Sequence, residues 1–158
     1  MLGFLALASA LGCGLMAGFF LAFSICVMKS LARLPPEQGI AAMQAINVVV
    51  INPLFLGTFF GTAVLCVVLT IGSFAPAGAS DAAAWLAFAG SALYVVGTVG
   101  VTMRFNVPRN NTLAAVVPHS PEGARVWADY VASWTAWNHV RTAAATAATV
   151  LLILAQRA

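Results

Sequence analysis

Four long apolar runs constrain this chain more than any other feature. They cover Leu2–Met28, Pro53–Phe74, Ala82–Met103 and a last segment that ends in Ala143–Ala155. About 20 consecutive apolar residues cross the hydrocarbon core of a bilayer as one helix. With 62% hydrophobic and only 7% charged residues, the composition does not fit a soluble domain of this length. We therefore predict an all-α integral membrane four-helix bundle that forms a single domain over residues 1–158.

Prolines and capping residues mark the connections between these runs. The segment Pro35–Glu37 is typical of a helix start, and the apolar face that follows predicts a short interfacial helix in the first loop. Residues 76–81 predict a short turn. In the third loop, Glu122–Ser133 is expected to form a second short helix, capped near Ser120, that leads into the fourth long helix.

A proline marks the expected end of the third long helix. Proline disfavours the helical conformation at the residue before it, so Pro108 is expected to stop the helix that begins at Ala82. The segment Arg104–Leu113 would then form a polar cluster at the membrane boundary.

Basic residues gather on one side of the predicted bundle. The loops after the first and third long helices carry Lys29, Arg33, Arg104, Arg109, Arg125 and Arg141. The opposite side carries only Arg157. The positive-inside rule then predicts loops one and three in the cytoplasm and both termini outside. We expect the membrane to be a bacterial inner membrane. A formal charge of +3 spread in this way does not indicate a nucleic-acid partner.

The densest polar chemistry stands at the start of the last apolar run, between Trp134 and Thr142. At 100° per residue, one helical face carries Tyr130, Trp134, Trp137, Asn138 and Arg141, while the imidazole of His139 points away from it. Tryptophan and arginine also anchor helices at the membrane interface. A regular polar stripe with an amide and a guanidinium, however, usually faces the interior of a bundle.

Further polar residues are expected at the same end of the bundle as this stripe. The candidate site residues are Asn47, Asn52, Arg104, Asn106, Asn110, Tyr130, Trp134, Trp137, Asn138, His139 and Arg141. Asn52 has a second interpretation as the N-cap of the helix that starts at Pro53. Polar groups concentrated at one mouth of an apolar bundle indicate a small-molecule pocket.

Three motifs in order resemble a known family. They are Met43-Gln-Ala-Ile-Asn47 with Asn52-Pro53, Asn106-Val-Pro108-x-Asn110-x-x-Leu113, and Trp134-x-x-Trp137-Asn138-x-x-Arg141-Thr142. Together they resemble the small four-helix membrane proteins grouped with anthrone oxygenases, many of which are known as domain of unknown function 1772. The resemblance implies oxidation of a flat phenolic or enolisable molecule by dioxygen, with no metal or other cofactor. Its implied partners are a small hydrophobic aromatic ligand and the lipid bilayer, and a homo-oligomer is compatible with it.

Such chemistry would need a base, a fixed positive charge and a dry, flat pocket. His139 is the only strong base candidate in the last motif, and Arg104 and Arg141 could hold an enolate oxygen or superoxide. The amides of Asn106, Asn110 and Asn138 could donate to the same oxygen. The aromatic rings of Tyr130, Trp134 and Trp137 could stack on the ligand. We expect Arg104, Asn110, Trp137, Asn138 and Arg141 to line one pocket.

Two other function classes remain open from the sequence. A non-catalytic binding or accessory membrane protein fits the lack of an unambiguous acid–base set. A haem or quinone redox protein is the third class, although His119 and His139 are the only histidines and no metal-ligand spacing supports them. No metal site is therefore predicted.

The predicted orientation can be tested with single reporter cysteines placed beside Arg33 and at Ala158. A membrane-impermeant thiol reagent should label the position beside Arg33 only from the cytoplasmic face and Ala158 only from the outside, because the basic loops are retained in the cytoplasm. Labelling of both positions from the same face would contradict the four-span arrangement.

Overall fold

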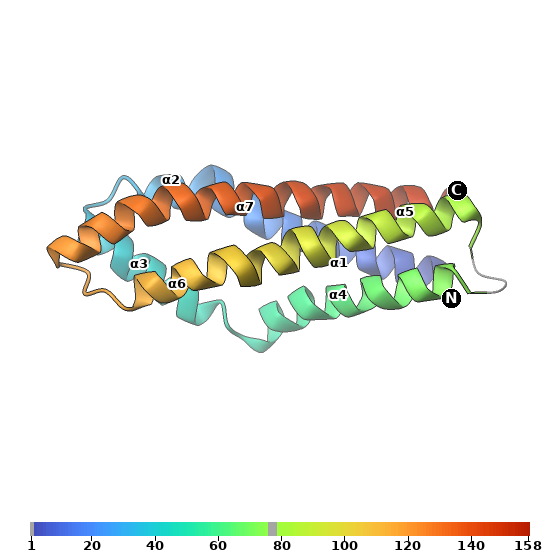
Figure 1. The fold of residues 1–158 in the computed structure, drawn as a ribbon, viewed down its shortest axis with the longest axis horizontal. Coiled ribbons are helices and arrows are strands. Elements are labelled where there is room, and N and C mark those ends of the chain that lie inside the picture. Colours follow the sequence, from blue (N-terminus) through green and yellow to red (C-terminus); the bar gives the residue numbers. More distant parts are fainter. Residues whose placement is uncertain (1, 76–78) are drawn as a thin grey trace.

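Four helices long and apolar enough to span a membrane dominate the fold. The structure, a computed structural model, describes residues 2–75 and 79–158. The spans are Leu2–Leu31, Pro53–Ser73, Asp81–Ala114 and Pro121–Ala155. They run side by side in one elongated bundle, with the N- and C-terminal ends together at one end of it (Figure 1). The predicted all-α membrane bundle is confirmed.

Two of the four spans, the first and the third, consist of several consecutive helical segments. The first contains α1 (Leu2–Ala22), the π-helical η1 (Phe23–Val27) and α2 (Met28–Leu31). The first loop holds α3 (Pro36–Val49), the helix predicted there, and α4 (Pro53–Ser73) follows. The third span contains α5 (Asp81–Ala92), η2 (Leu93–Gly100), η3 (Thr102–Asn106) and α6 (Val107–Ala114). The last span is α7 (Pro121–Ala155). The turn predicted at 76–81 includes residues 76–78, which lie outside the described residues.

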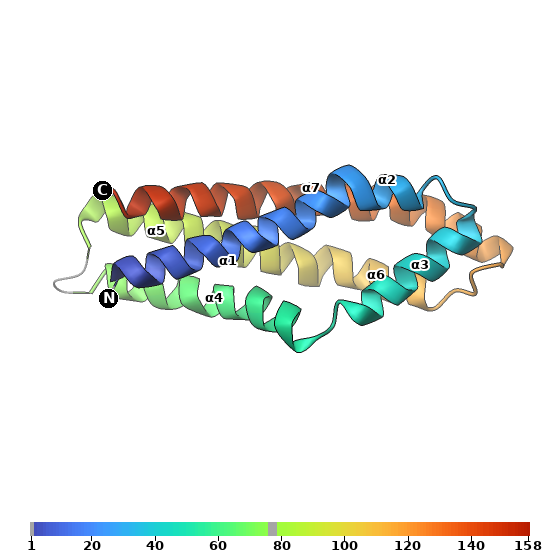
Figure 2. The same cartoon turned by 180° about the vertical axis from the view of Figure 1, so that it is seen from behind.

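The spans differ in length, and this difference gives the bundle two halves. The 21 residues of α4 rise about 31 Å, which matches the roughly 30 Å hydrocarbon core of a bilayer. The 35 residues of α7 rise about 52 Å and continue well past the start of α4. Beyond that point α2, α3, α6 and the first part of α7 form an end lobe, visible in Figure 2 at the end of the bundle away from the termini.

Each half has its own apolar core. In the membrane half, small and aromatic side chains of α1, α4, α5 and α7 pack together, including Cys13, Phe20, Phe59 and Ala148. In the end lobe, a second core contains Met28, Leu31, Ile40, Met43, Leu113, Trp127, Tyr130 and Trp134. The two cores meet near Phe20 and Phe23, which are neighbours on the first span.

The third span does not end at Pro108, so that prediction is wrong. The helix continues through Pro108 to Ala114, with the proline at the start of α6 directly after η3. A proline in a regular α-helix removes one hydrogen bond and clashes with the carbonyl four residues earlier. The wider π-helical turn of η3 accommodates both effects. The guanidinium of Arg109 also donates to the Phe105 carbonyl at 2.7 Å, which satisfies an acceptor in this irregular stretch.

The helix expected over Glu122–Ser133 is present but is not a separate element. Ser120 caps it, with its side chain accepting from the Gly123 amide at 2.9 Å. No proline or glycine interrupts the chain after Gly123, so the helix runs unbroken to Ala155. The stripe at Trp134–Arg141 therefore lies in the middle of a long helix, where the end lobe joins the membrane half.

Asn52 is the N-cap of α4. Its Oδ1 accepts from the Phe55 amide at 3.0 Å and its Nδ2 donates to the Val49 carbonyl at 2.9 Å. We expect Asn52→Ala to lower the free energy of unfolding by about 1 kcal/mol, while Asn52→Ser changes it much less because serine caps nearly as well. Denaturation of the detergent-solubilised protein measures both values. Equal losses for the two variants would contradict a capping role.

Candidate functional site

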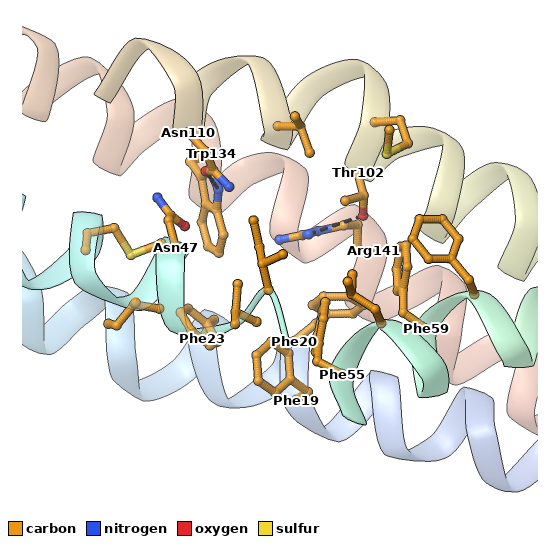
Figure 3. A pocket seen from close by; sticks show the side chains of 18 residues that line it. Phe19, Phe20, Phe23, Asn47, Phe55, Phe59, Thr102, Asn110, Trp134 and Arg141 are labelled. Carbon is orange, nitrogen blue, oxygen red and sulfur yellow. Dashed lines mark hydrogen bonds between the residues drawn. The ribbon is translucent and has the colours of Figure 1, made fainter. Parts of the chain in front are cut away.

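A cavity of about 180 Å³ lies where the two cores meet. It is enclosed by α1 and η1 on one side, α3 and α4 on another, and η3, α6 and α7 on the third (Figure 3). Six of the ten phenylalanines line it, namely Phe19, Phe20, Phe23, Phe55, Phe59 and Phe60. The polar lining residues are Asn47, Thr102, Asn110, Trp134 and Arg141. The cavity is therefore a mainly aromatic chamber with a few polar groups at fixed places, as in many small-molecule sites.

Arg141 supplies the only charged group of the cavity lining. The side chain is 4% exposed. Its Nη2 donates to Asn138 Oδ1 at 2.7 Å and its Nη1 donates to Thr102 Oγ1 at 3.2 Å, while Nε has no partner. All four acidic residues of the chain are exposed, and none lines the cavity. The positive charge of Arg141 is thus held by neutral groups alone.

Aromatic faces complete the surroundings of this guanidinium. The Arg141 Cζ lies 4.3 Å from the ring centroid of Phe20 and 5.0 Å from that of Trp134. Cation–π attraction of this kind is worth about 2 kcal/mol or more when the cation is desolvated. This attraction offsets only part of the cost of burying an unpaired charge, which is several kcal/mol per ion. The cavity therefore retains an unneutralised cation beside its empty space.

Asn138 fixes the position of Arg141 from behind. It is fully buried, and its Nδ2 donates to the Phe20 carbonyl at 2.8 Å and to Ser24 Oγ at 2.7 Å. The π-helical turn η1 starts just after Phe20 and changes the regular hydrogen-bond pattern there. With Nδ2 used in this way, the amide must present Oδ1 to Arg141. Asn138 thus links α1, η1 and the guanidinium.

A pair of amides forms a second polar region, beyond Trp134 from Arg141 and on the other side of the guanidinium from Phe59 (Figure 3). Asn110 Oδ1 accepts from Tyr130 Oη at 2.9 Å and from Trp134 Nε1 at 2.8 Å. Asn47, from α3, lines the same region, and its buried Nδ2 has no hydrogen-bond partner. A buried donor without an acceptor costs about 1–3 kcal/mol. The Asn47 side chain also lies close to the Tyr130 hydroxyl, so it belongs to the same polar region as Asn110.

His139 lies on the other side of α7 from the cavity. Its imidazole is exposed, and its Nδ1 is 3.0 Å from Ser24 Oγ. It borders a separate surface hollow between α2 and α7, beside Lys29. The sequence already indicated that the ring points away from the stripe of Trp134 and Arg141. In this geometry His139 cannot reach a molecule in the cavity.

Arg104 and Trp137 also lie outside the cavity, and Asn138 stands behind Arg141 without lining it. The expectation of one pocket shared with Asn110 and Arg141 is therefore wrong for these three residues. Arg104 is exposed, and its Cζ lies 5.5 Å from the centroid of the Phe105 ring. Trp137 stacks on the same Phe105 ring, with 3.6 Å between the two ring centroids. Because the third span continues past Pro108, Arg104 remains on its outer surface and does not turn inward at a helix end.

Three of the predicted site residues stabilise the fold and do not line the cavity, namely Asn52, Asn106 and Tyr130. Asn52 caps α4, as described above, and does not line the cavity. Asn106 is 1% exposed and donates to the Trp134 carbonyl at 3.2 Å. Tyr130 is buried and stacked between Trp127 and Trp134. These residues support the cavity wall from outside.

Sequence reasoning missed the phenylalanine walls. Phe19, Phe20 and Phe23 come from the first span, and Phe55, Phe59 and Phe60 from α4. Each group contains two rings four residues apart, which share a helix face, and a third ring adjacent to one of them. That spacing is a signal for an aromatic surface, although in an apolar span it is also typical of ordinary core packing. Thr102 gave no signal in the sequence.

The histidines do not gather with other metal-binding side chains. His119 is exposed in the turn before α7, and His139 is exposed on α7. Within residues 2–75 and 79–158, no group of three or more His, Cys, Asp or Glu side chains could hold a metal ion together.

Comparisons with known proteins agree with the motifs at this site. The sequence model of the anthrone oxygenase family matches residues 55–151, which include most of α4, the third span and most of α7. No curated protein and no solved structure gives a significant match. The matched segment covers well over half of the chain and contains Thr102, Asn110, Trp134, Asn138 and Arg141. This integral membrane protein belongs to the anthrone oxygenase family.

Proposed function

We propose that this protein is a membrane oxygenase that binds a flat phenolic or enolisable aromatic molecule, of the anthrone type, in the phenylalanine-walled cavity. The observation that carries the proposal is Arg141, a buried guanidinium with no carboxylate partner that borders an aromatic cavity. A ligand with a negatively charged oxygen beside Arg141 would supply the counter-charge that no side chain of the cavity supplies.

The charge of Arg141 selects the ionised form of such a ligand. An opposite charge at close range favours the charged form of an acidic group. In a cavity from which water is largely excluded, this effect is much stronger than in solution. A phenol or enol bound with its oxygen at Arg141 would therefore release its proton more readily than it does in water.

The rest of the cavity suits a planar ring system. Rings from α1, η1 and α4 offer apolar faces and edges on several sides. Asn47 lines the cavity on the side of Asn110 and Trp134, and its Nδ2 is available for a second oxygen of the ligand. An anthrone-type molecule has a flat tricyclic body and an oxygen that becomes negative on enolisation.

The proposed reaction balances with dioxygen as the only co-reactant. One methylene carbon and one O₂ give one carbonyl and one water, so the four electrons that O₂ gains come from that carbon. The ligand binds in its neutral form and ionises beside Arg141. Because no basic side chain lines the cavity, the proton leaves through the rim of the cavity to interfacial water at the edge of the hydrocarbon core. Arg141 holds the enolate oxygen, and the electron-rich enolate reduces O₂ directly, without a metal or other cofactor. Neutral amides and aromatic rings keep water from the reacting carbon.

One observation favours a second candidate, a binding protein without catalytic activity. No histidine, carboxylate or lysine lines the cavity, so no side chain there can serve as a strong general base. If the enolate does not form on binding, the cavity would hold the neutral molecule and leave it unchanged. Oxygen uptake separates the two candidates, because only the oxygenase consumes O₂ when an anthrone is added.

The variant Arg141→Met tests the role assigned to the guanidinium. We expect it to weaken binding of an ionisable anthrone at least tenfold and to abolish oxygen uptake. Truncating one partner of a buried charge pair costs about 2–5 kcal/mol, and about 1.4 kcal/mol corresponds to tenfold in affinity. The thermal stability of the ligand-free variant should be equal to or higher than that of the wild type, since an unpaired buried charge has been replaced by an apolar side chain.

His139→Ala is the matched control on the same helix. It removes the other candidate for acid–base chemistry, whose imidazole faces away from the cavity. We expect this variant to keep both binding and oxygen uptake. Loss of oxygen uptake in His139→Ala together with its retention in Arg141→Met would contradict the proposal.

A further inference from the structure

We infer that the cavity opens sideways into the bilayer between α4 and η3, and that its ligand enters from the lipid phase as a neutral, membrane-dissolved weak acid. The nature of the ligand rests on the proposed function, whereas the opening rests on the structure of the rim.

Four apolar residues belong both to the cavity and to the outer surface. One of them, Phe19 on α1, is the least exposed at 37%, and the three most exposed lie together beside α4 and η3. Phe60 on α4 is 44% exposed, Met103 on η3 is 54% exposed, and Ile51, just before α4, is 68% exposed. All three line the cavity. A side chain that borders a cavity and is also largely exposed marks a place where the cavity reaches the surface. The opening therefore lies between the start of α4 and the η3 segment.

The surroundings of this rim place it in lipid. Val48, Val49 and Leu54, around the connection from α3 to α4, are 73%, 72% and 81% exposed. Contiguous apolar residues with such exposure are unfavourable in water and mark a membrane or partner contact. They stand at the end of α3 and in the first turn of α4, and the length of α4 matches the hydrocarbon core. The rim thus faces acyl chains near the edge of that core.

The end of the cavity toward the end lobe is closed by polar contacts. Asn110 joins Tyr130 and Trp134 through two hydrogen bonds there. Helix α3 covers the same end and is fastened to the end of α6, because Gln44 Nε2 donates to the carbonyls of Leu113 at 2.8 Å and Val116 at 3.1 Å. Access from the aqueous side would have to break these contacts, whereas the lipid side needs only apolar side chains to move.

This route defines the chemical class of the ligand further. An ionised molecule does not accumulate in a hydrocarbon phase, because transfer of an isolated charge is very costly. The ligand that enters past Phe60 and Met103 must therefore be neutral in the bilayer and become ionised only beside Arg141. Phenols and enols with pKa values above neutral pH behave in this way, whereas carboxylic acids do not.

Photolabelling with lipid tests the opening without any ligand. The purified protein is placed in phosphatidylcholine vesicles that contain a diazirine on one acyl chain, and adducts are mapped by mass spectrometry. Phe59 and Tyr94 are the matched pair, since both are aromatic, nearly fully buried and 6.4 Å apart, and only Phe59 lines the cavity. We expect several-fold more adduct at Phe59 than at Tyr94.

A rim variant shows whether the label passes between α4 and η3. Met103→Trp should fill the opening and reduce the Phe59 adduct several-fold. Val96→Trp is the control, because Val96 is a lipid-exposed residue on the same span (70% exposed) that does not line the cavity. Equal labelling of Phe59 and Tyr94, or an adduct at Phe59 that Met103→Trp leaves unchanged, would overturn the inference.

Binding kinetics extend the test to an anthrone added to the same vesicles. Met103→Trp should slow association and dissociation together by several-fold with little change in affinity, and Gln44→Ala should change neither rate. Faster association in Gln44→Ala with no effect of Met103→Trp would show entry from the water side and overturn the inference. If the proposed function is wrong but the opening is correct, the result is different again. The wild type would then bind no anthrone, while the lipid labelling at Phe59 would persist.

Discussion

The buried guanidinium of Arg141 is the constraint on which the rest of the site depends. A cation buried in a membrane bundle needs partners, and the chain provides the Asn138 side-chain oxygen, the Thr102 hydroxyl and the faces of Phe20 and Trp134. None of these neutralises the charge. A carboxylate would have stabilised the fold more directly. Its absence beside an aromatic cavity is explained most simply if a ligand supplies the negative group.

Irregular helical turns place these partners. The π-helical segment η1 brings Phe23 and Ser24 to the junction of the two halves, next to the Phe20 carbonyl that Asn138 uses. On the third span, η3 starts at Thr102, which contacts Arg141, and accommodates Pro108 one turn later. Single π-helical turns are frequent at functional sites because they re-aim side chains without ending a helix. Here they also let two spans continue into the end lobe that closes the cavity.

The sequence was sufficient for the spans, because about 20 apolar residues in a row have few alternatives. It also predicted that Trp134, Asn138 and Arg141 share an inward face, since helical periodicity determines this directly. It failed at Pro108, where a wide turn absorbs a proline that would end a regular helix, and that error placed Arg104 wrongly beside Arg141. The sequence could not distinguish phenylalanines that line a cavity from phenylalanines that pack in an ordinary core. The cavity arises from the way α3 and α4 pack against the other spans, and the spacing of the rings does not show this arrangement.

The most direct test of this account is a spectroscopic titration of a bound anthrone, whose enolate absorbs at longer wavelength than the neutral form. The apparent pKa of the ligand is measured in vesicles with the protein, in vesicles without it, and with Arg141→Met. The account predicts that the pKa of the ligand is lower when it is bound to the wild type than in empty vesicles, and that Arg141→Met removes this shift. An unchanged or higher pKa in the wild type would contradict the claim that Arg141 selects the anion.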